Sequence, residues 1–159
     1  MLAVGVVLTN LVLASFTAAL SAVLIQHKLG LFSGMRSHPW ILLVLGVAGL
    51  DLFAYHAHLL LHKIALGWKF HRVHHSELEV DVTTAFRQHP GETLWRALWQ
   101  CLGTAVFGLP FWVVPIYLSL SSLNAVLEHA NIRMSDRWDT WLRLLIVTPT
   151  CIKSITPAK

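Results

Sequence analysis

Residues 51–75, DLFAYHAHLLLHKIALGWKFHRVHH, decide the fold, because they place six histidines in and directly after a strongly apolar segment. On a helix, Asp51, Tyr55, His58 and His62 share one stripe, since they are spaced at i, i+4, i+7 and i+11. An ionisable group inside an apolar helix needs a partner. Asp51 could supply a helix-packing hydrogen bond. Alternatively, His58 and His62 bind one metal, and Asp51 or Tyr55 orients these ligands from behind.

A second group of imidazoles follows within ten residues. His71, His74 and His75 are spaced at i, i+3 and i+4, so on a helix all three project to one side. Adjacent imidazoles repel one another when protonated, so this pattern favours a buried cation over a solvated histidine-rich loop. The pattern fits His89 equally as a ligand, as a residue that supports a ligand, or as a structural loop residue. His129 is predicted to be a ligand.

The number of imidazoles indicates two metals rather than one. Ligand type alone leaves zinc, copper, iron and nickel open. The H-E-x-x-H motif is absent, which argues against a familiar zinc protease. A zinc-binding or haem-binding membrane module remains an alternative, although haem between helices normally uses single, separated histidines.

The composition predicts one integral membrane domain. Of the 159 residues, 55% are hydrophobic and only 13% are charged, and the mean hydropathy is +0.61. The formal net charge is +4, and the basic residues are scattered, so no nucleic-acid partner is expected. Cys101 and Cys151 lie too far apart in sequence to suggest a disulfide framework or a thiolate metal site.

Two N-terminal transmembrane helices are predicted. Residues 2–25 carry no charge and, as a helix, reach about 36 Å, enough for a hydrocarbon core of about 30 Å. A signal peptide is the alternative for this segment. Residues 39–62 form the second span, with Pro39 in the first helical turn.

Later segments predict a broken helical hairpin and an interfacial helix. Residues 94–123 are apolar but are interrupted by Gly108, Pro110 and Pro115, which favours either a hairpin dipping into the bilayer or two tilted helices. Residues 135–147 place Trp138, Trp141, Leu142 and Leu145 on one face, opposite Arg137 and Arg143, with Ser135 or Asp136 as the cap. The predicted fold class is therefore an all-α integral membrane protein with cytoplasmic or interfacial helices carrying histidines.

The distribution of lysine and arginine predicts the orientation. Only Lys28 and Arg36 lie between the two spans, whereas residues 63–96 hold five basic residues and the chain after residue 130 holds five more. By the positive-inside rule, the N-terminus and both histidine-bearing regions face the cytoplasm.

Four segments together resemble the fatty acid hydroxylase/sterol desaturase superfamily of membrane di-iron oxidases. They are HLLLH (58–62), HRVHH (71–75), DVTTAFRQHPGE (81–92) and LEHANIRM (127–134), and the resemblance runs from about Asp51 to Pro149. It implies a cytoplasmic centre of two iron ions, for which zinc could substitute. The metal ligands would be His58, His62, His71, His74, His75 and His129.

The resemblance also implies the reaction and the partners. O2 would be the co-substrate in the hydroxylation or desaturation of a C–H bond in a lipid such as a sterol or fatty acyl chain. The lipid would enter between the two spans and the hairpin. Since no flavin or nicotinamide fingerprint is present, electrons would come from an external cytochrome b5-like or ferredoxin-like donor.

The C-terminal residues depart from the family pattern. A third box, again H-x-x-H-H, normally follows a stretch like Val147-Thr148-Pro149, but residues 150–157 read TCIKSITP. One permitted codon set for these residues, read one base out of phase, encodes D-M-H-K-I-H-H-S. A single-base deletion near Pro149 would therefore divide the chain into a family domain, 1–149, and an out-of-frame tail, 150–159. A truly divergent C-terminus is the alternative.

This difference matters for activity. Without the third box the chain as written would bind iron incompletely, because lysine, serine and threonine cannot replace neutral nitrogen donors. It would then be an inactive relative, or a non-enzymatic metal-binding membrane protein.

Overall fold

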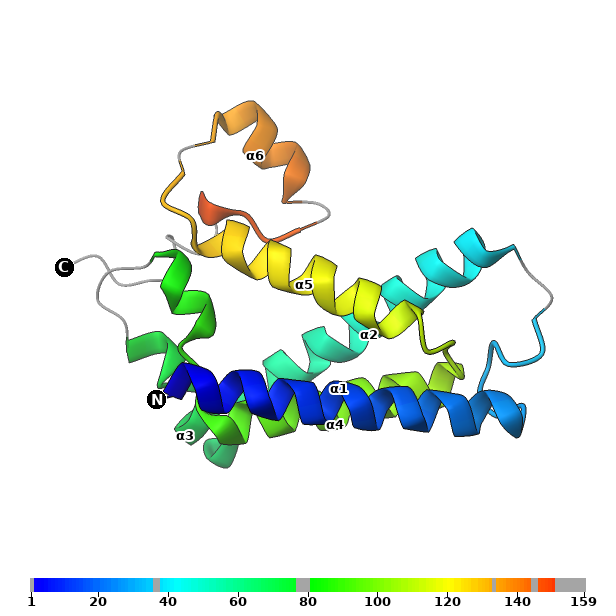
Figure 1. Cartoon of the computed structure of the whole chain (residues 1–159). Helices are drawn as coiled ribbons and strands as arrows, with labels where there is room; N and C mark the ends of the chain where they lie inside the picture. The colour runs from blue at the N-terminus through cyan, green and yellow to red at the C-terminus, as the bar shows by residue number, and fades with distance from the viewer. Residues whose placement is uncertain (1, 36–37, 77–80, 133, 144–145, 151–159) are drawn as a thin grey trace.

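The chain is helical throughout its described parts, as the sequence predicts. The computed structural model describes residues 2–35, 38–76, 81–132, 134–143 and 146–150, with side chains from residue 12 onward, and these residues contain no strand. The elements in chain order are α1 (Leu2–Gln26), α2 (Pro39–Lys63), α3 (Ala65–His71), η1 (His74–Ser76), η2 (Val82–Phe86), α4 (Pro90–Phe107), α5 (Val113–His129) and α6 (Asp136–Leu142), where η marks a 3-10 helix (Figure 1).

One described helix is long and apolar enough to cross a membrane. This helix is α2, which has 25 residues and begins with Pro39 in its first turn, where no backbone hydrogen bond is lost. In α1 the apolar stretch with described side chains, Val12–Gln26, is shorter. The predicted span at residues 2–25 and the cytoplasmic orientation therefore stay predictions, whereas residues 39–62 fall within the candidate span.

Four helices form the body of the molecule. In Figure 1, α1 and α4 lie side by side and run in the same direction, whereas α2 and α5 run the opposite way. The α4 helix packs against both α1 and α2, and the indole Nε1 of Trp95 donates a 3.0 Å hydrogen bond to the carbonyl of Ala57 in α2. The buried core lies where α2 meets the start of α5 and comprises Leu50, Leu109, Val113, Val114 and Tyr117.

The predicted interruption of the 94–123 region is confirmed, but only two of the three residues expected to cause it, Gly108 and Pro110, lie at the break. The α4 helix ends at Gly108, whose φ of 63° is the left-handed conformation that favours glycine at a helix C-terminus. Pro110 follows in the connection. Pro115, by contrast, lies within the first turn of α5 and does not break it, because the first turn needs no donor there. The two helices then diverge, and α5 packs on η2 and α2.

The loop between α1 and α2 is bound tightly to the end of α4. The amide groups of Leu31 and Phe32 donate to the carbonyls of Val106 and Phe107 at 2.9 and 2.8 Å. Gly30 permits this contact, since a Cβ atom there would lie 2.2 Å from the Gly108 amide nitrogen. Two glycines thus fix the end of the molecule opposite the histidines.

The α6 helix differs in its details from the prediction. Ser135 occupies the N-cap position but makes no capping hydrogen bond. Asp139 is buried instead: Thr148 Oγ1 donates to it at 2.6 Å, and Arg143 pairs with it. Trp138 and Trp141 are exposed, and the position of α6 in the membrane interface stays a prediction. Leu145 and the tail residues 151–159 lie outside the described residues, so the frameshift stays a prediction.

We predict that Gly108→Ala lowers the free energy of unfolding by about 2–4 kcal/mol, from the left-handed φ and the overpacking together. A Cβ atom at Gly108 would lie 2.2 Å from the Leu29 carbonyl oxygen. Denaturant unfolding of the detergent-purified chain measures the loss. Gly34→Ala is the matched control, because a Cβ atom there meets nothing within 4 Å. Equal stability of the two variants would contradict the prediction.

Candidate metal centre

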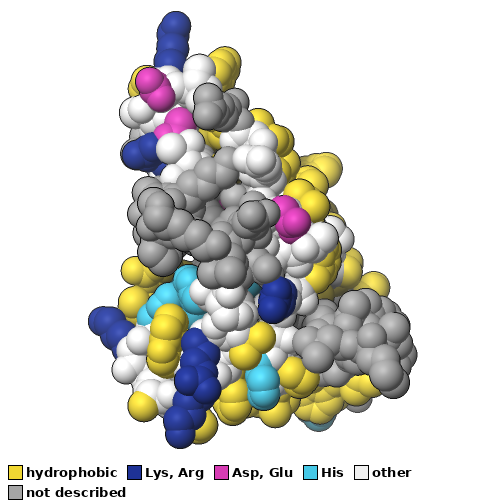
Figure 2. All heavy atoms as spheres, turned by 90° about the vertical axis from the view of Figure 1, so that its left-hand side faces the viewer, with side chains coloured by type: hydrophobic (Ala, Val, Ile, Leu, Met, Phe, Trp, Pro, Cys, Tyr) yellow, Lys and Arg dark blue, Asp and Glu magenta, His cyan; other side chains and the backbone are white. Residues whose placement is uncertain are grey.

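The predicted ligands gather at one end of the molecule. The α2 helix ends there, α3 and η1 follow it, and α5 returns to the same end with His129 in its last turn (Figure 1). Figure 2 faces this end and shows histidine side chains at the surface with lysine and arginine side chains beside them. Segments far apart in sequence therefore supply one cluster.

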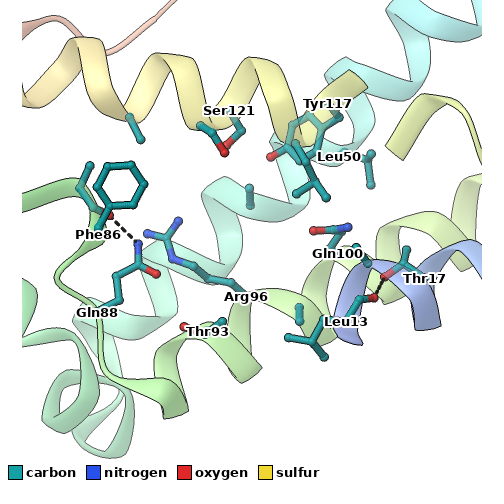
Figure 3. A pocket seen from close by; sticks show the side chains of 17 residues that line it. Leu13, Thr17, Leu50, Phe86, Gln88, Thr93, Arg96, Gln100, Tyr117 and Ser121 are labelled. Atoms are coloured by element: carbon teal, nitrogen blue, oxygen red, sulfur yellow. Dashed lines mark hydrogen bonds between the residues drawn. The ribbon is translucent and has the colours of Figure 1, made fainter. Parts of the chain in front are cut away.

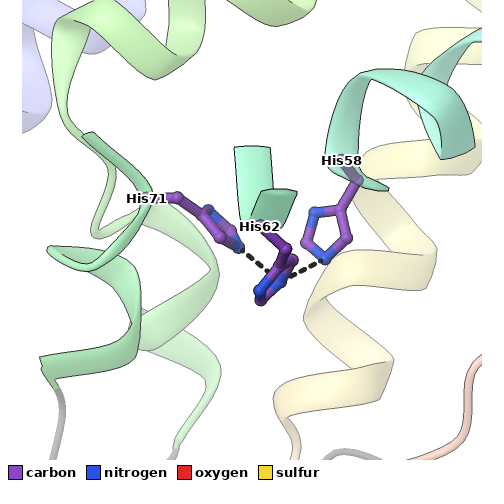
Figure 4. Close-up of side chains that lie close together, drawn as sticks. All are labelled: His58, His62 and His71. Carbon is purple, nitrogen blue, oxygen red and sulfur yellow. Dashed lines mark hydrogen bonds between the residues drawn. The ribbon is translucent and has the colours of Figure 1, made fainter. Parts of the chain in front are cut away.

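The first group of imidazoles converges through its Nε2 atoms. The ligand atoms of His58, His62 and His71 lie within 4.8 Å of one another (Figure 4). His62 Nε2 lies 3.3 Å from His58 Nε2 and 3.2 Å from His71 Nε2, and His75 Nε2 lies 3.1 Å from His71 Nε2. Two nitrogens bound at about 2.1 Å to one transition-metal ion lie about 3.0–3.4 Å apart. The spacing therefore fits ligands that share an ion.

His74 and His129 form a second group beside the first. Their Nε2 atoms are 3.2 Å apart, and the His74 ring stacks on His71 with centroids 5.6 Å apart. His129 Nδ1 donates to the Ala125 carbonyl at 2.7 Å, which leaves the Nε2 lone pair available to a metal. All six predicted ligands are thus brought together, in two adjoining groups.

The local structure that positions His71, His74 and His75 is not the single helix expected. The α3 helix ends at His71, and a separate 3-10 turn begins at His74. The three rings nevertheless lie together, with centroids between 4.7 and 5.6 Å apart. Trp68 in α3 covers the cluster, with its ring 5.6 Å from both His62 and His75.

Glu92 is a buried carboxylate that the sequence analysis did not single out. It is 0% exposed, and its Oε1 lies 3.0 Å from His71 Nδ1 and 3.1 Å from Arg96 Nε. Burial alone would raise its pKa, but the hydrogen bond from His71 and the charge of Arg96 outweigh burial and lower the pKa to about 2. An ionised Glu92 holds the His71 proton on Nδ1, so His71 presents its Nε2 lone pair to a metal.

Arg96 connects this carboxylate to a second ligand. Its Nη2 donates to His58 Nδ1 at 3.2 Å. Arginine has no acceptor, so Nδ1 must carry the lone pair in this contact and the His58 proton lies on Nε2. His58 can therefore bind a metal through Nε2 only after its proton moves to Nδ1, and this shift requires Arg96 to turn away from Nδ1. His71 and His129 need no such change.

Two of the imidazoles outside the candidate span are held neutral. Burial, with the neighbouring His129, lowers the pKa of His74 to about 4. Burial, with the neighbouring His71, lowers the pKa of His75 to about 4. Both rings are therefore uncharged at neutral pH, which is the form that binds metal.

Within the described residues, none of the three predicted supporting residues makes a hydrogen bond to one of the six ligands. Tyr55 is 61% exposed and packs its ring on His56, and Asp51 is also exposed. In the described part of the chain neither makes a hydrogen bond to His58 or His62. His89 instead caps α4, accepting a 3.0 Å hydrogen bond from the Gly91 amide and stacking on Phe70. It supports the site only indirectly, by fixing the helix that carries Glu92.

A cavity of about 460 Å³ lies between the helices, and two of its lining residues contact histidines. Residues of α1, α2, α4, α5 and η2 line it (Figure 3). Two of its lining residues reach the ligands directly: Arg96 donates to His58, and the Ala125 carbonyl accepts from His129. No histidine is among the described lining residues, so the cavity is connected to each imidazole group through one intervening residue, Arg96 or Ala125.

Comparison with known proteins agrees with this arrangement. The sequence model of the family described as fatty acid hydroxylase matches residues 43–152, more than half of the chain. This stretch contains all six imidazoles of the two groups, and also Glu92 and Arg96. No solved structure matches the chain.

We predict that Glu92→Gln weakens zinc binding by about 10–100-fold, because a neutral amide no longer holds the His71 proton on Nδ1. Competition between the purified chain and a fluorescent zinc chelator measures the affinity. Asp136→Asn, an exposed carboxylate on α6, is the control and leaves the affinity unchanged. Unaltered zinc affinity in a folded Glu92→Gln variant would show that the carboxylate does not orient the ligand.

Proposed function

The chain belongs to the fatty acid hydroxylase family, and on that premise we propose that it is a membrane-bound oxidoreductase. It uses O2 and two iron ions to hydroxylate or desaturate a C–H bond of a lipid. One observation supports the proposal: two adjoining groups of imidazole Nε2 atoms lie at the end of a helix long and apolar enough to span a membrane, and Arg96 and Ala125 connect them to a nearby cavity.

The residues divide between the two ions as follows. His58, His62, His71 and His75 would hold one iron, and His74 with His129 would contribute to the other. The irons, when bound, supply the binding and reduction of O2, and so oxidise the C–H bond. Zinc fits the same nitrogen donors but lacks redox chemistry.

The protein's own residues orient and isolate the reaction. Glu92 fixes the tautomer of His71, and His129 is fixed by the Ala125 carbonyl. Trp68 covers His62 and His75 on one side. The cavity holds the lipid beside the ligands and excludes bulk water from the reacting carbon.

Electrons would come from a separate protein. Lys63, Lys69 and Arg72 are exposed and lie at the end of α2, in α3 and directly after α3, beside the histidines. A cationic surface at this end would attract an acidic donor such as a cytochrome b5-like or ferredoxin-like protein. With this end on the cytoplasmic side, as the positive-inside rule predicts, the donor would be cytoplasmic.

The out-of-frame tail is part of the proposal. His74 and His129 together offer the second ion two nitrogens, fewer than the first group offers. A third box at residues 150–157, with sequence D-M-H-K-I-H-H-S, would add further imidazoles. The chain as written would then be the inactive form, and the restored chain the active form.

The restored chain, with DMHKIHHS in place of residues 150–157, is predicted to bind about two irons and to oxidise lipid. Expression with a cytochrome b5 donor, followed by mass spectrometry of extracted lipids under ¹⁸O₂, detects both hydroxylated and desaturated products. His71→Ala removes a ligand and is expected to abolish product. His56→Ala is the matched control, since His56 is exposed and its ring donates to the Leu52 carbonyl of its own helix rather than to a predicted ligand.

Three results would contradict the proposal. They are equal iron content in the written and restored chains, product formation by the His71→Ala variant, and a Soret band in the purified protein. The nucleotide sequence is an independent check, because a gene without an out-of-phase H-x-x-H-H after the Pro149 codon excludes the frameshift.

A further inference from the structure

The cavity near the candidate metal centre has more polar lining residues than binding a plain alkyl chain would require. Side chains of Thr17, Gln88, Thr93, Gln100, Tyr117 and Ser121 line it together with Arg96. Figure 3 shows Gln100 pointing into the cavity from α4, and Tyr117 and Ser121 facing it from α5. Apolar walls with a few convergent polar groups are typical of a site that recognises a particular functional group.

Gln100 is the informative member of this lining. Thr17 donates to the Leu13 carbonyl, and Gln88 donates to the Ala85 carbonyl. Within the described part of the chain, the carboxamide of Gln100 makes no hydrogen bond, although Gln100 is half-buried inside the helix bundle. The Gln100 side chain is only partly buried, so a ligand in the cavity can reach its carboxamide and form a hydrogen bond with it.

The charge of the cavity selects the kind of ligand. Arg96 is the one charged residue among its described lining residues, and Glu92 neutralises it through a 3.1 Å ion pair. All other polar groups there are hydroxyls and amides, which bind neutral oxygens. A free carboxylate would find no uncompensated positive charge in the cavity.

The position of Gln100 also sets where the ligand's oxygen lies. Glu92, Arg96 and Gln100 are spaced at i, i+4 and i+8 on α4, so they follow one face of the helix away from His71. Gln100 therefore lies about 6 Å beyond Arg96 along the helix axis. An oxygen bound there is several bonds from any carbon held against the imidazoles.

Taking these observations together, we infer that the cavity recognises a neutral lipid carrying a hydroxyl or keto oxygen within its apolar body, bound by the Gln100 carboxamide. This inference rests on the proposed function, since it names the substrate class of the same site. It favours an oxygenated neutral lipid over a free fatty acid, whose only polar group is a terminal carboxylate.

Direct binding tests the inference without iron, O2 or an electron donor. Radiolabelled dioctyl ketone, heptadecane and palmitic acid are titrated onto the full chain in nanodiscs, with empty nanodiscs subtracted. The ketone and the alkane have the same chain length and differ by one oxygen. We expect the ketone to bind about tenfold more tightly than the alkane, as one buried hydrogen bond provides, and more tightly than the acid.

Variants then test whether the preference for the ketone over the alkane depends on Gln100. Gln100→Leu keeps the volume and is expected to remove the preference for the ketone while leaving alkane binding intact. Leu98→Ala is the control, because Leu98 is 58% exposed and lies outside the cavity lining, and it is expected to retain the preference.

Each contrary result overturns the inference. Equal affinity for ketone and alkane, tighter binding of palmitic acid, absence of binding, or a ketone preference that survives Gln100→Leu would all do so. Because the wild-type comparison stands alone, the test does not depend on the variant folding. A ketone preference in a chain that never oxidises lipid, even when restored, would refute the proposed function and leave the ligand assignment standing.

Discussion

The ion pair of one buried carboxylate underlies the histidine cluster, the candidate metal centre of this molecule. Glu92 is fully buried and ionised, a state that would be strongly unfavourable without partners. Its partners are His71 at the end of α3 and Arg96 on α4, and Arg96 in turn reaches His58 on α2. One carboxylate therefore links three helices and two ligands, so the ligand geometry cannot form until these helices are packed.

The other end of the molecule is fixed by backbone contacts rather than by charge. Gly30 and Gly108 let the α1–α2 loop lie directly against the end of α4, with backbone hydrogen bonds to Val106 and Phe107. The α4 helix is thereby held at both of its ends, and Trp95 fixes it against α2 between them. A helix held in this way can present side chains to both a metal centre and a cavity with little freedom to shift.

The sequence predicts the helices and the imidazole cluster well, because both follow from local patterns. Apolar runs mark α1 and α2 almost to their ends, and spacings of three and four residues bring His58 near His62 and His71 near His75. The features that the sequence does not predict depend on contacts between residues far apart in the chain. Glu92 is 21 positions from His71 in the printed sequence, so no local periodicity connects them. Only its place in the first turn of α4, four residues before Arg96, indicates a role.

His89 shows a second limit of sequence patterns. Serine, threonine, asparagine and aspartate are the usual N-cap residues, so a histidine next to proline indicates no cap. In the structure, His89 accepts the hydrogen bond of the Gly91 amide, and Phe70 of α3 stacks on its ring.

Because Glu92, Arg96 and Gln100 share one face of α4, the proposed ligand support and the proposed lipid recognition lie on the same helix. Natural divergence toward new lipids would therefore be expected to spare α4 and to accumulate on the opposite wall, at positions such as Ser121, Ser122 and Phe86. The same wall is the sensible place to begin laboratory evolution of this scaffold.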